Sequence, residues 1–221
     1  MIPERFSTEI PKRMRSLLNE LEPIARHKDL LTSFLLMAAM PVLIIPLERI
    51  AKTSRGPRNE INDVNKARSF AFGWAQIKFK KFAEIFLFNQ QERSKWRYVI
   101  IPKSQIENST SWKDSLGRHP IHPGAVNEVG AQDVENILTV MRNSLAHGSI
   151  VFLDERGEEV PNRKVTYIAF VSRAQGQERQ TADSYRVLIV DEENFLIFLK
   201  RWTEWIGTFE MPSSFSRRFA A

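Results

Sequence analysis

The stretch that decides the fold reads Asp133-Val-Glu-Asn-Ile-Leu-Thr-Val-Met-Arg-Asn-Ser-Leu-Ala-His-Gly148. Apolar residues recur in it every three or four positions, which is the period of one helix face; these are Val134, Ile137, Leu138, Met141 and Leu145. Gln132 or Asp133 can begin such a helix, and a glycine at 148 can end it in the left-handed conformation. We therefore predict an amphipathic helix whose apolar stripe lies in the core.

A second face of this helix carries an unusual set of polar side chains. Asn136, Thr139, Asn143 and His147 follow one another at the same spacing. A face that only meets solvent usually carries Glu and Lys instead. The pattern indicates a functional surface, with a surface histidine of no particular role as the competing interpretation.

His147 is the residue on this face best suited to chemistry. Asn143 lies four positions earlier, so its amide can orient the imidazole ring. Arg142 lies five positions earlier, about 140° around the helix, and meets His147 only through its long side chain or across a symmetric partner. The last turn of a helix favours a protonated imidazole. An imidazole and a guanidinium together suit phosphodiester cleavage, with general acid–base catalysis from one and charge stabilisation from the other.

The full string Arg142-Asn-Ser-Leu-Ala-His-Gly at the end of a helix resembles the motif of the HEPN (higher eukaryotes and prokaryotes nucleotide-binding) superfamily. The resemblance implies a helical bundle and a homodimer in which the two motif helices meet. It also implies a composite ribonuclease site that needs no metal or other cofactor, because the RNA 2′-hydroxyl is the nucleophile. Arg142 and His147 would be catalytic, and Asn143 would be the polar residue of the motif. Some HEPN toxins carry a modified Tyr two positions after the His, where this chain has Ser149.

Composition excludes several other classes of site. The sequence has no Cys, so disulfides, Cys-ligated zinc and thiol nucleophiles are excluded. A net charge of +6 and a pI near 9.7 favour an anionic partner such as RNA. The beginning Met1-Ile-Pro-Glu-Arg-Phe does not resemble a signal peptide, and we expect a cytoplasmic protein.

The residues from Leu30 to Leu47 carry no charge and raise the question of a membrane span. Pro41 and Pro46 interrupt this stretch, and Asp29 and Glu48 bound it closely. We predict a buried core helix and no membrane insertion. Glu48-Arg49 closes this helix and could point into the motif site, although a structural ion pair is the favoured interpretation.

Two further helices are predicted in the first half of the chain. One covers residues 11–25, and the other begins at Asn62 or Asp63 and continues to about Asn89. The second has an apolar face formed by Phe70, Phe72, Trp74, Ile77, Phe82, Phe86 and Leu87. Its polar face is rich in lysine. Such a face could bind RNA, but lysines are more common simply on the solvent-exposed side of a core helix.

The remaining pattern predicts strands near the C-terminus. Residues 96–101 are either a strand or an apolar segment, whereas 150–153, 165–171 and 185–190 have strand composition. Asp191 can cap a last helix. The fold class is therefore mainly α, a HEPN-like bundle with a small antiparallel β element before the last helix. We divide a single domain, 1–221, into a helical core (1–148, with an irregular loop at 102–130), a β insertion (149–190), a C-terminal helix (191–208) and a tail (209–221).

Two functional hypotheses follow from these patterns. The first is a metal-independent HEPN-type endoribonuclease, toxin or defence-related, that acts on RNA as a homodimer across the Arg142/His147 helix and has an antitoxin partner. The second is a non-catalytic HEPN-like module that binds RNA, a nucleotide or another protein. His119 and His122 could suggest zinc, but flanking prolines and the lack of a third ligand make a plain loop the better interpretation.

Overall fold

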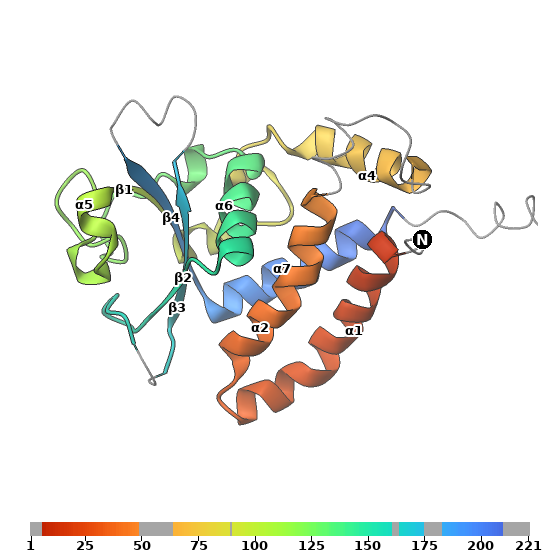
Figure 1. Cartoon of the computed structure of the whole chain (residues 1–221), viewed down its shortest axis with the longest axis horizontal. Coiled ribbons are helices and arrows are strands. Elements are labelled where there is room, and N and C mark those ends of the chain that lie inside the picture. The colour runs from red at the N-terminus through yellow and green to blue at the C-terminus, as the bar shows by residue number, and fades with distance from the viewer. Residues whose placement is uncertain (1–5, 49–63, 89, 161–163, 175–182, 210–221) are drawn as a thin grey trace, which may run out of the picture.

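The computed structural model describes residues 6–48, 64–88, 90–160, 164–174 and 183–209. Within these ranges, five longer helices and one short one form most of the structure (Figure 1). They are α1 (Phe6–His27), α2 (Leu31–Ala39), α4 (Val64–Ile77), α5 (Lys103–Ile106), α6 (Val134–His147) and α7 (Glu192–Gly207). Shorter helical turns are Met40–Ile44, Phe82–Glu84, Gln90–Lys95, Ser109–Ser111 and Val129–Ala131.

Four strands form one antiparallel sheet in the order β1-β4-β3-β2. They are β1 (Trp96–Pro102), β2 (Ile150–Leu153), β3 (Tyr167–Arg173) and β4 (Ser184–Asp191). The three later strands lie where the sequence predicts them. The edge strand β1 comes from before α6, so the sheet is not confined to residues 149–190 as predicted. The fold is mainly α with a small antiparallel sheet, and the division into a helical core and an insertion stays a prediction.

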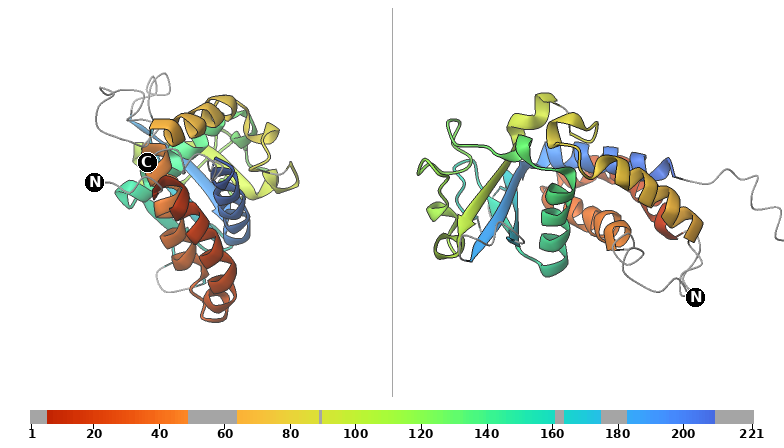
Figure 2. Two further views of the ribbon diagram at one scale, coloured as in Figure 1. Left: turned by 90° about the vertical axis from the view of Figure 1, so that its right-hand side faces the viewer. Right: turned by 90° about the horizontal axis from the view of Figure 1, so that it is seen from above.

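The sheet is buried on both faces, and its strands therefore read as nearly continuous apolar runs. Alternate residues of β3 and β4, such as Phe170 and Leu188, belong to the core shared with the helices. The residues between them, such as Ala169 and Ile189, pack with Trp112 on the opposite face. Figures 1 and 2 show this arrangement, with α6 on one side of the sheet and the α5 segment on the other.

The segment at 102–130 that we predict as irregular is ordered by one buried carboxylate. Asp114 accepts hydrogen bonds from the backbone amides of Leu116 (2.9 Å), Arg118 (2.8 Å) and Val126 (2.6 Å). Its neighbour Trp112 is fully buried against the sheet. The segment is thus a folded cover of the sheet rather than a loop extending into solvent.

The uncharged stretch after Leu30 is a single helix with a π-helical turn at Met40–Ile44. By length and composition the part from Leu31 to Glu48 could cross a membrane, and 44% of this segment is buried in the structure. It packs against α1, α6 and α7, in agreement with the predicted core helix. Pro46 has no amide hydrogen to donate to the carbonyl of Val42, and the buried indole of Trp202 donates to that carbonyl at 2.6 Å.

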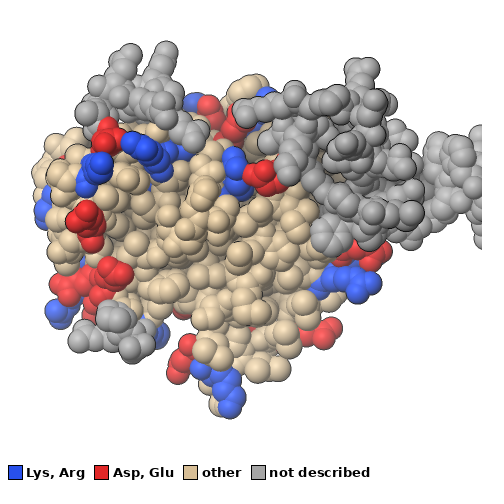
Figure 3. Space-filling model, viewed as in Figure 1, with Lys and Arg blue, Asp and Glu red and all other residues tan. Residues whose placement is uncertain are grey.

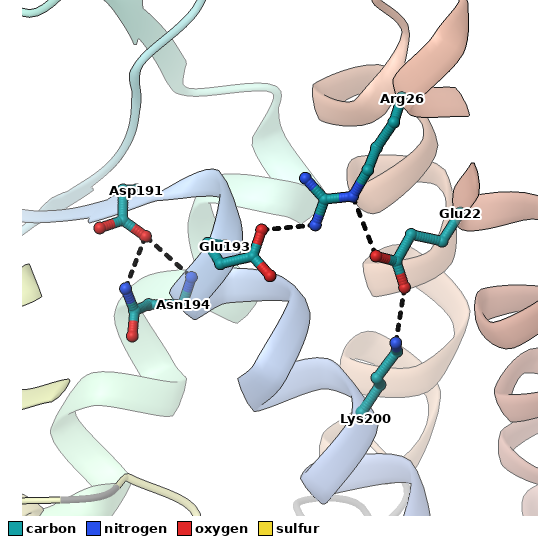
Figure 4. Close-up of polar contacts among 6 residues, drawn as sticks. All are labelled: Glu22, Arg26, Asp191, Glu193, Asn194 and Lys200. Atoms are coloured by element: carbon teal, nitrogen blue, oxygen red, sulfur yellow. Dashed lines mark hydrogen bonds and ion pairs between the residues drawn. The ribbon is translucent and has the colours of Figure 1, made fainter. Parts of the chain in front are cut away.

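Polar contacts join α1 to the first half of α7 (Figure 4). Glu22 accepts hydrogen bonds from Arg26 (2.9 Å) and Lys200 (2.6 Å), and Arg26 also pairs with Glu193. Asp191 caps α7 as predicted, because its carboxylate accepts from the amide of Asn194 at 2.8 Å. The ion pairs connect α1 to α7 beside the core that the two helices share.

The helix predicted to end near Asn89 ends at Ile77 instead. Two tertiary hydrogen bonds explain the difference: the carbonyls of Lys78 and Lys80 accept from the first amides of α6 at 3.0 Å each. Phe82 then turns into the core and stacks on Phe88 with ring centroids 4.1 Å apart. The predicted cap at 62–63 and the tail from residue 210 lie outside the described residues.

Candidate functional site

The helix that carries the motif begins and ends as the sequence predicts. Asp133 is its N-cap residue, and Gly148 ends it with a left-handed φ of 67°. The apolar residues of the predicted stripe are all buried, together with Val140 and Ser144. The polar face is half-buried at Asn136, Thr139 and Asn143 and becomes exposed at His147.

The C-terminal turns of α6 are bound firmly to β3. The buried hydroxyl of Ser144 donates to one of two carbonyls at 2.8 Å, that of Val140 within the helix or that of Val171 in the strand. The carbonyl of Ser149 accepts from the amide of Val171 at 3.0 Å. Since both bonds flank His147, this residue stands on a rigid helix end although its own side chain is exposed.

Arg142 is held by a carboxylate from a distant part of the chain. Its Nη1 donates to Oε1 of Glu48 at 2.6 Å, and both side chains are about one third exposed (31% and 37%). Glu48 lies at the end of the helix that begins at Leu31, which packs on α6. Glu48 therefore lies at the motif site, the alternative that the sequence interpretation did not favour, and its ion pair places an acidic group beside the motif arginine. Arg49 lies outside the described residues. A guanidinium carries five N–H donors, so one bond leaves most of them for another ligand.

Asn143 does not orient the imidazole as predicted. Its amide nitrogen donates to the hydroxyl of Ser172 on β3 at 3.2 Å. Among the described residues, the side chain of His147 makes no hydrogen bond, and none joins its imidazole to Arg142. The three motif residues thus lie on one helix, but only Arg142 and Asn143 are held in place by their neighbours.

Behind Asn143 lies a buried arginine that sequence reasoning missed. Arg186 on β4 is 4% exposed, and its Nη2 donates to Ser172 (3.4 Å) and to the carbonyl of Arg173 (3.3 Å). Ser172 therefore joins Arg186 to the motif helix. The signal was present in the sequence, because Arg186 is the one charged residue in the apolar run Tyr185-Arg-Val-Leu-Ile-Val190.

The two histidines of the loop have structural roles. His119 stacks on Trp112 and lies 3.1 Å from the carbonyl of Ser109 through Nε2, and burial lowers its pKa below the ordinary value. His122 accepts from the amide of Gly124 at 3.0 Å. Among the residues that the structure describes, no group of three His, Asp or Glu side chains could hold a metal ion.

The model of the family HEPN pEK499 p136 matches residues 1–212, nearly the whole chain. The chain belongs to this HEPN family. No curated protein and no solved structure matches the sequence. The family match confirms the superfamily inferred from the motif and supports a nucleotide-related or RNA-related role.

The face of this HEPN protein that carries α6 is poor in charge. Figure 3 shows a broad central area over α6 and α2 in which Lys, Arg, Asp and Glu are few, with charged side chains gathered toward the margins. The helix that supplies Glu48 also exposes Met37 (71%) and Met40 (47%). Depletion of charge and exposed Met are typical of protein–protein interfaces.

Proposed function

We propose that this HEPN protein is a metal-independent endoribonuclease in which Arg142 and His147 of two copies form a composite site. The observation that carries the proposal is the end of α6, where an exposed imidazole stands on a rigid turn and a guanidinium is oriented one turn earlier by Glu48. Family membership supports it, because HEPN domains generally act on RNA as dimers.

The chemistry needs only these side chains and the RNA itself. One imidazole accepts the proton of the 2′-hydroxyl as its oxygen attacks the adjacent phosphorus, and the other, protonated, donates a proton to the departing 5′-oxygen. The guanidinium stabilises the charge that develops on the phosphorane oxygens. The products are a 2′,3′-cyclic phosphate and a 5′-hydroxyl end.

In this proposal, a second copy of the chain completes the site, because one chain does not bring its own Arg142 and His147 together. Arg142 and His147 diverge by about 140° around the helix, and no hydrogen bond joins them within the described residues. In a two-fold dimer, residues near the axis meet their own copies, so the two histidines and two arginines would converge. The charge-poor face around α6 is suited to such contact.

The proposal also covers the biological role, the location and the protein partner of this ribonuclease. We place it as a toxin or defence factor in the cytoplasm, restrained by an antitoxin partner; of this, the net charge of +6 supports only the RNA partner. Asn143 is assigned to the site as a positioning residue, since its amide binds Ser172.

The test is cleavage of single-stranded RNA by the purified full chain. We expect cyclic-phosphate ends and activity that persists in EDTA, with Arg142→Ala and His147→Ala each reducing the rate about 10²–10⁴-fold while the folded state is retained. Activity that survives both substitutions would overturn the proposal. Salt-sensitive RNA binding without turnover would favour the non-catalytic alternative.

A further inference from the structure

Three phenylalanines around the end of α4 are exposed to an unusual degree. Phe72, Phe79 and Phe86 are 69%, 66% and 55% exposed. Phe72 and Phe86 are the two members of the predicted apolar face that the structure leaves in solvent, whereas the other members are buried. Single exposed apolar residues are ordinary, but several aromatic rings in one place indicate a binding surface.

Two of these rings line a groove between α4 and α7, which lie side by side in Figure 2. The groove has a volume of about 370 Å³, and its aromatic lining is completed by Trp205 and Phe209. Phe86 lies 6.4 Å from Trp205 between ring centroids. Gly73 permits this geometry, because a Cβ at that position would overlap the ring of Phe209.

Lysines accompany the exposed rings. Lys80 lines the groove, and Nζ of Lys78 lies 4.4 Å from the centroid of Phe79, within cation–π range. Among the described residues that line the groove there is one carboxylate, that of Glu84, which accepts from the backbone amide of Lys81 at 3.1 Å. With Lys78 beside the groove, the described surroundings carry two lysines against one carboxylate, which favours an anionic ligand with flat rings.

We propose that this aromatic groove, defined by Phe72, Lys80, Phe86, Trp205 and Phe209, binds single-stranded RNA. Bases stack on the rings of Phe72 and Phe86, while Lys78 and Lys80 contact the phosphates. Stacking on aromatic side chains beside a basic track is the general mode of single-strand recognition. Paired bases in an RNA duplex are not free to stack in this way, so the groove selects unpaired RNA.

The groove is connected directly to the motif helix. The first amides of α6 donate to the carbonyls of Lys78 and Lys80, and Lys81 forms an ion pair with Asp133 at 2.7 Å. His147 lies thirteen residues after Val134 on the same helix, about 20 Å away by helical rise. The inference rests on the proposed function in one respect: the bound strand would be the flank of the RNA that is cleaved at the other end of α6.

The experiment measures binding apart from cleavage. The full chain carrying His147→Ala is titrated with fluorescein-labelled A₁₂, U₁₂ and a 12-base-pair RNA duplex. Phe72→Leu and Phe86→Leu keep apolar bulk but remove the aromatic ring, and we expect each to weaken A₁₂ binding about tenfold. Phe72→Trp keeps binding. Lys80→Ala lowers the dependence of log affinity on log salt by about 0.7. Duplex binding changes little in every variant.

Leu116→Ala is the matched control, because Leu116 is 60% exposed on the segment that covers the other face of the sheet. The inference would be overturned if both leucine variants bound A₁₂ as tightly as the His147→Ala protein in which Phe72 and Phe86 are unchanged. So would conversion of a dimer to a monomer by Phe86→Leu, which would identify the groove as a contact between copies. If the leucine variants lose RNA binding while the unmodified chain cleaves no RNA, the groove is an RNA site and the proposed function is wrong. If the unmodified chain cleaves RNA but the leucine variants bind it normally, the proposed function holds and the groove is not an RNA site.

Discussion

Glu48 and Arg142 are 94 positions apart in the sequence and form an ion pair of 2.6 Å beside the HEPN motif. The pair joins the end of the helix after Leu30 to the middle of α6. Because the side chains are only partly buried, their contribution to the free energy of unfolding is small, about 1 kcal/mol or less. Its main effect is to hold one edge of the guanidinium, which leaves further N–H donors for another ligand.

We predict that Glu48→Gln lowers RNA cleavage more than it lowers stability. The amide keeps the shape of the side chain but gives a weaker hydrogen bond, so the guanidinium loses its fixed orientation. The expected rate is about tenfold lower, with RNA affinity unchanged or higher since a negative charge is removed. The measurement compares kcat with the affinity for a non-cleavable RNA.

Glu204→Gln is the control for this substitution. Glu204 pairs with Arg15 at 3.1 Å, and both of these side chains are at least half exposed on α7 and α1. An equal loss of rate in both variants would show that the effect is not specific to Arg142.

Asn143 and Ser172 form the second contact of the motif, and we predict that they act as a pair. Asn143→Ala and Ser172→Ala should each destabilise the protein, and the double variant should lose less than the sum of the two. A coupling of about 0.5–1 kcal/mol is expected from urea unfolding. If Asn143→Ala abolishes cleavage while Ser172→Ala does not, the amide contacts RNA directly and the positioning role is wrong.

The motif helix could be predicted from the sequence because its signals are local. The apolar period from Val134 to Leu145 and the glycine at 148 determine the helix and its buried side without help from other elements. Asp191 gives an equally local signal for α7. The family resemblance carried by Arg142 and His147 depends on the same stretch, and the match across residues 1–212 confirms it.

What the sequence could not predict depends on contacts between distant residues. The helix predicted to continue past Ile77 stops there because the carbonyls of Lys78 and Lys80 bind α6. Periodicity alone does not separate a strand from an apolar segment at residues 96–102, and only pairing with β4 decides it. The partner of Asn143 could not be found either, since helical spacing says nothing of Ser172 on β3.

Trp202→Phe tests whether the indole of Trp202 stabilises the helix that contains Pro46. The substitution keeps an aromatic ring but removes the donor to the carbonyl of Val42, which Pro46 leaves without its usual amide partner. We expect a loss of about 2–3 kcal/mol in the free energy of unfolding, from a buried unsatisfied carbonyl and a small cavity. Trp205→Phe on the same helix is the control, because the described residues offer its indole no hydrogen bond. Equal losses would indicate that only ring volume matters.

The last prediction concerns pH and rests on Glu22 (Figure 4). Burial alone would raise the pKa of this carboxyl, but hydrogen bonds from Lys200 and Arg26 outweigh burial and hold the pKa below its ordinary value. A lowered pKa in the folded state means that the carboxylate contributes its full stabilisation above the pKa of the unfolded chain. That contribution is lost as the pH falls through the folded pKa.

Glu22→Gln should therefore destabilise the protein by about 1 kcal/mol at neutral pH. In acid the difference from the unmodified chain should shrink, because both side chains are then uncharged. Urea unfolding at a series of pH values measures it, and Glu20→Gln is the control, since Glu20 is exposed on the same helix and makes no ion pair among the described residues. A difference that stays constant with pH would mean that Glu22 stabilises the contact between α1 and α7 through packing rather than through its charge.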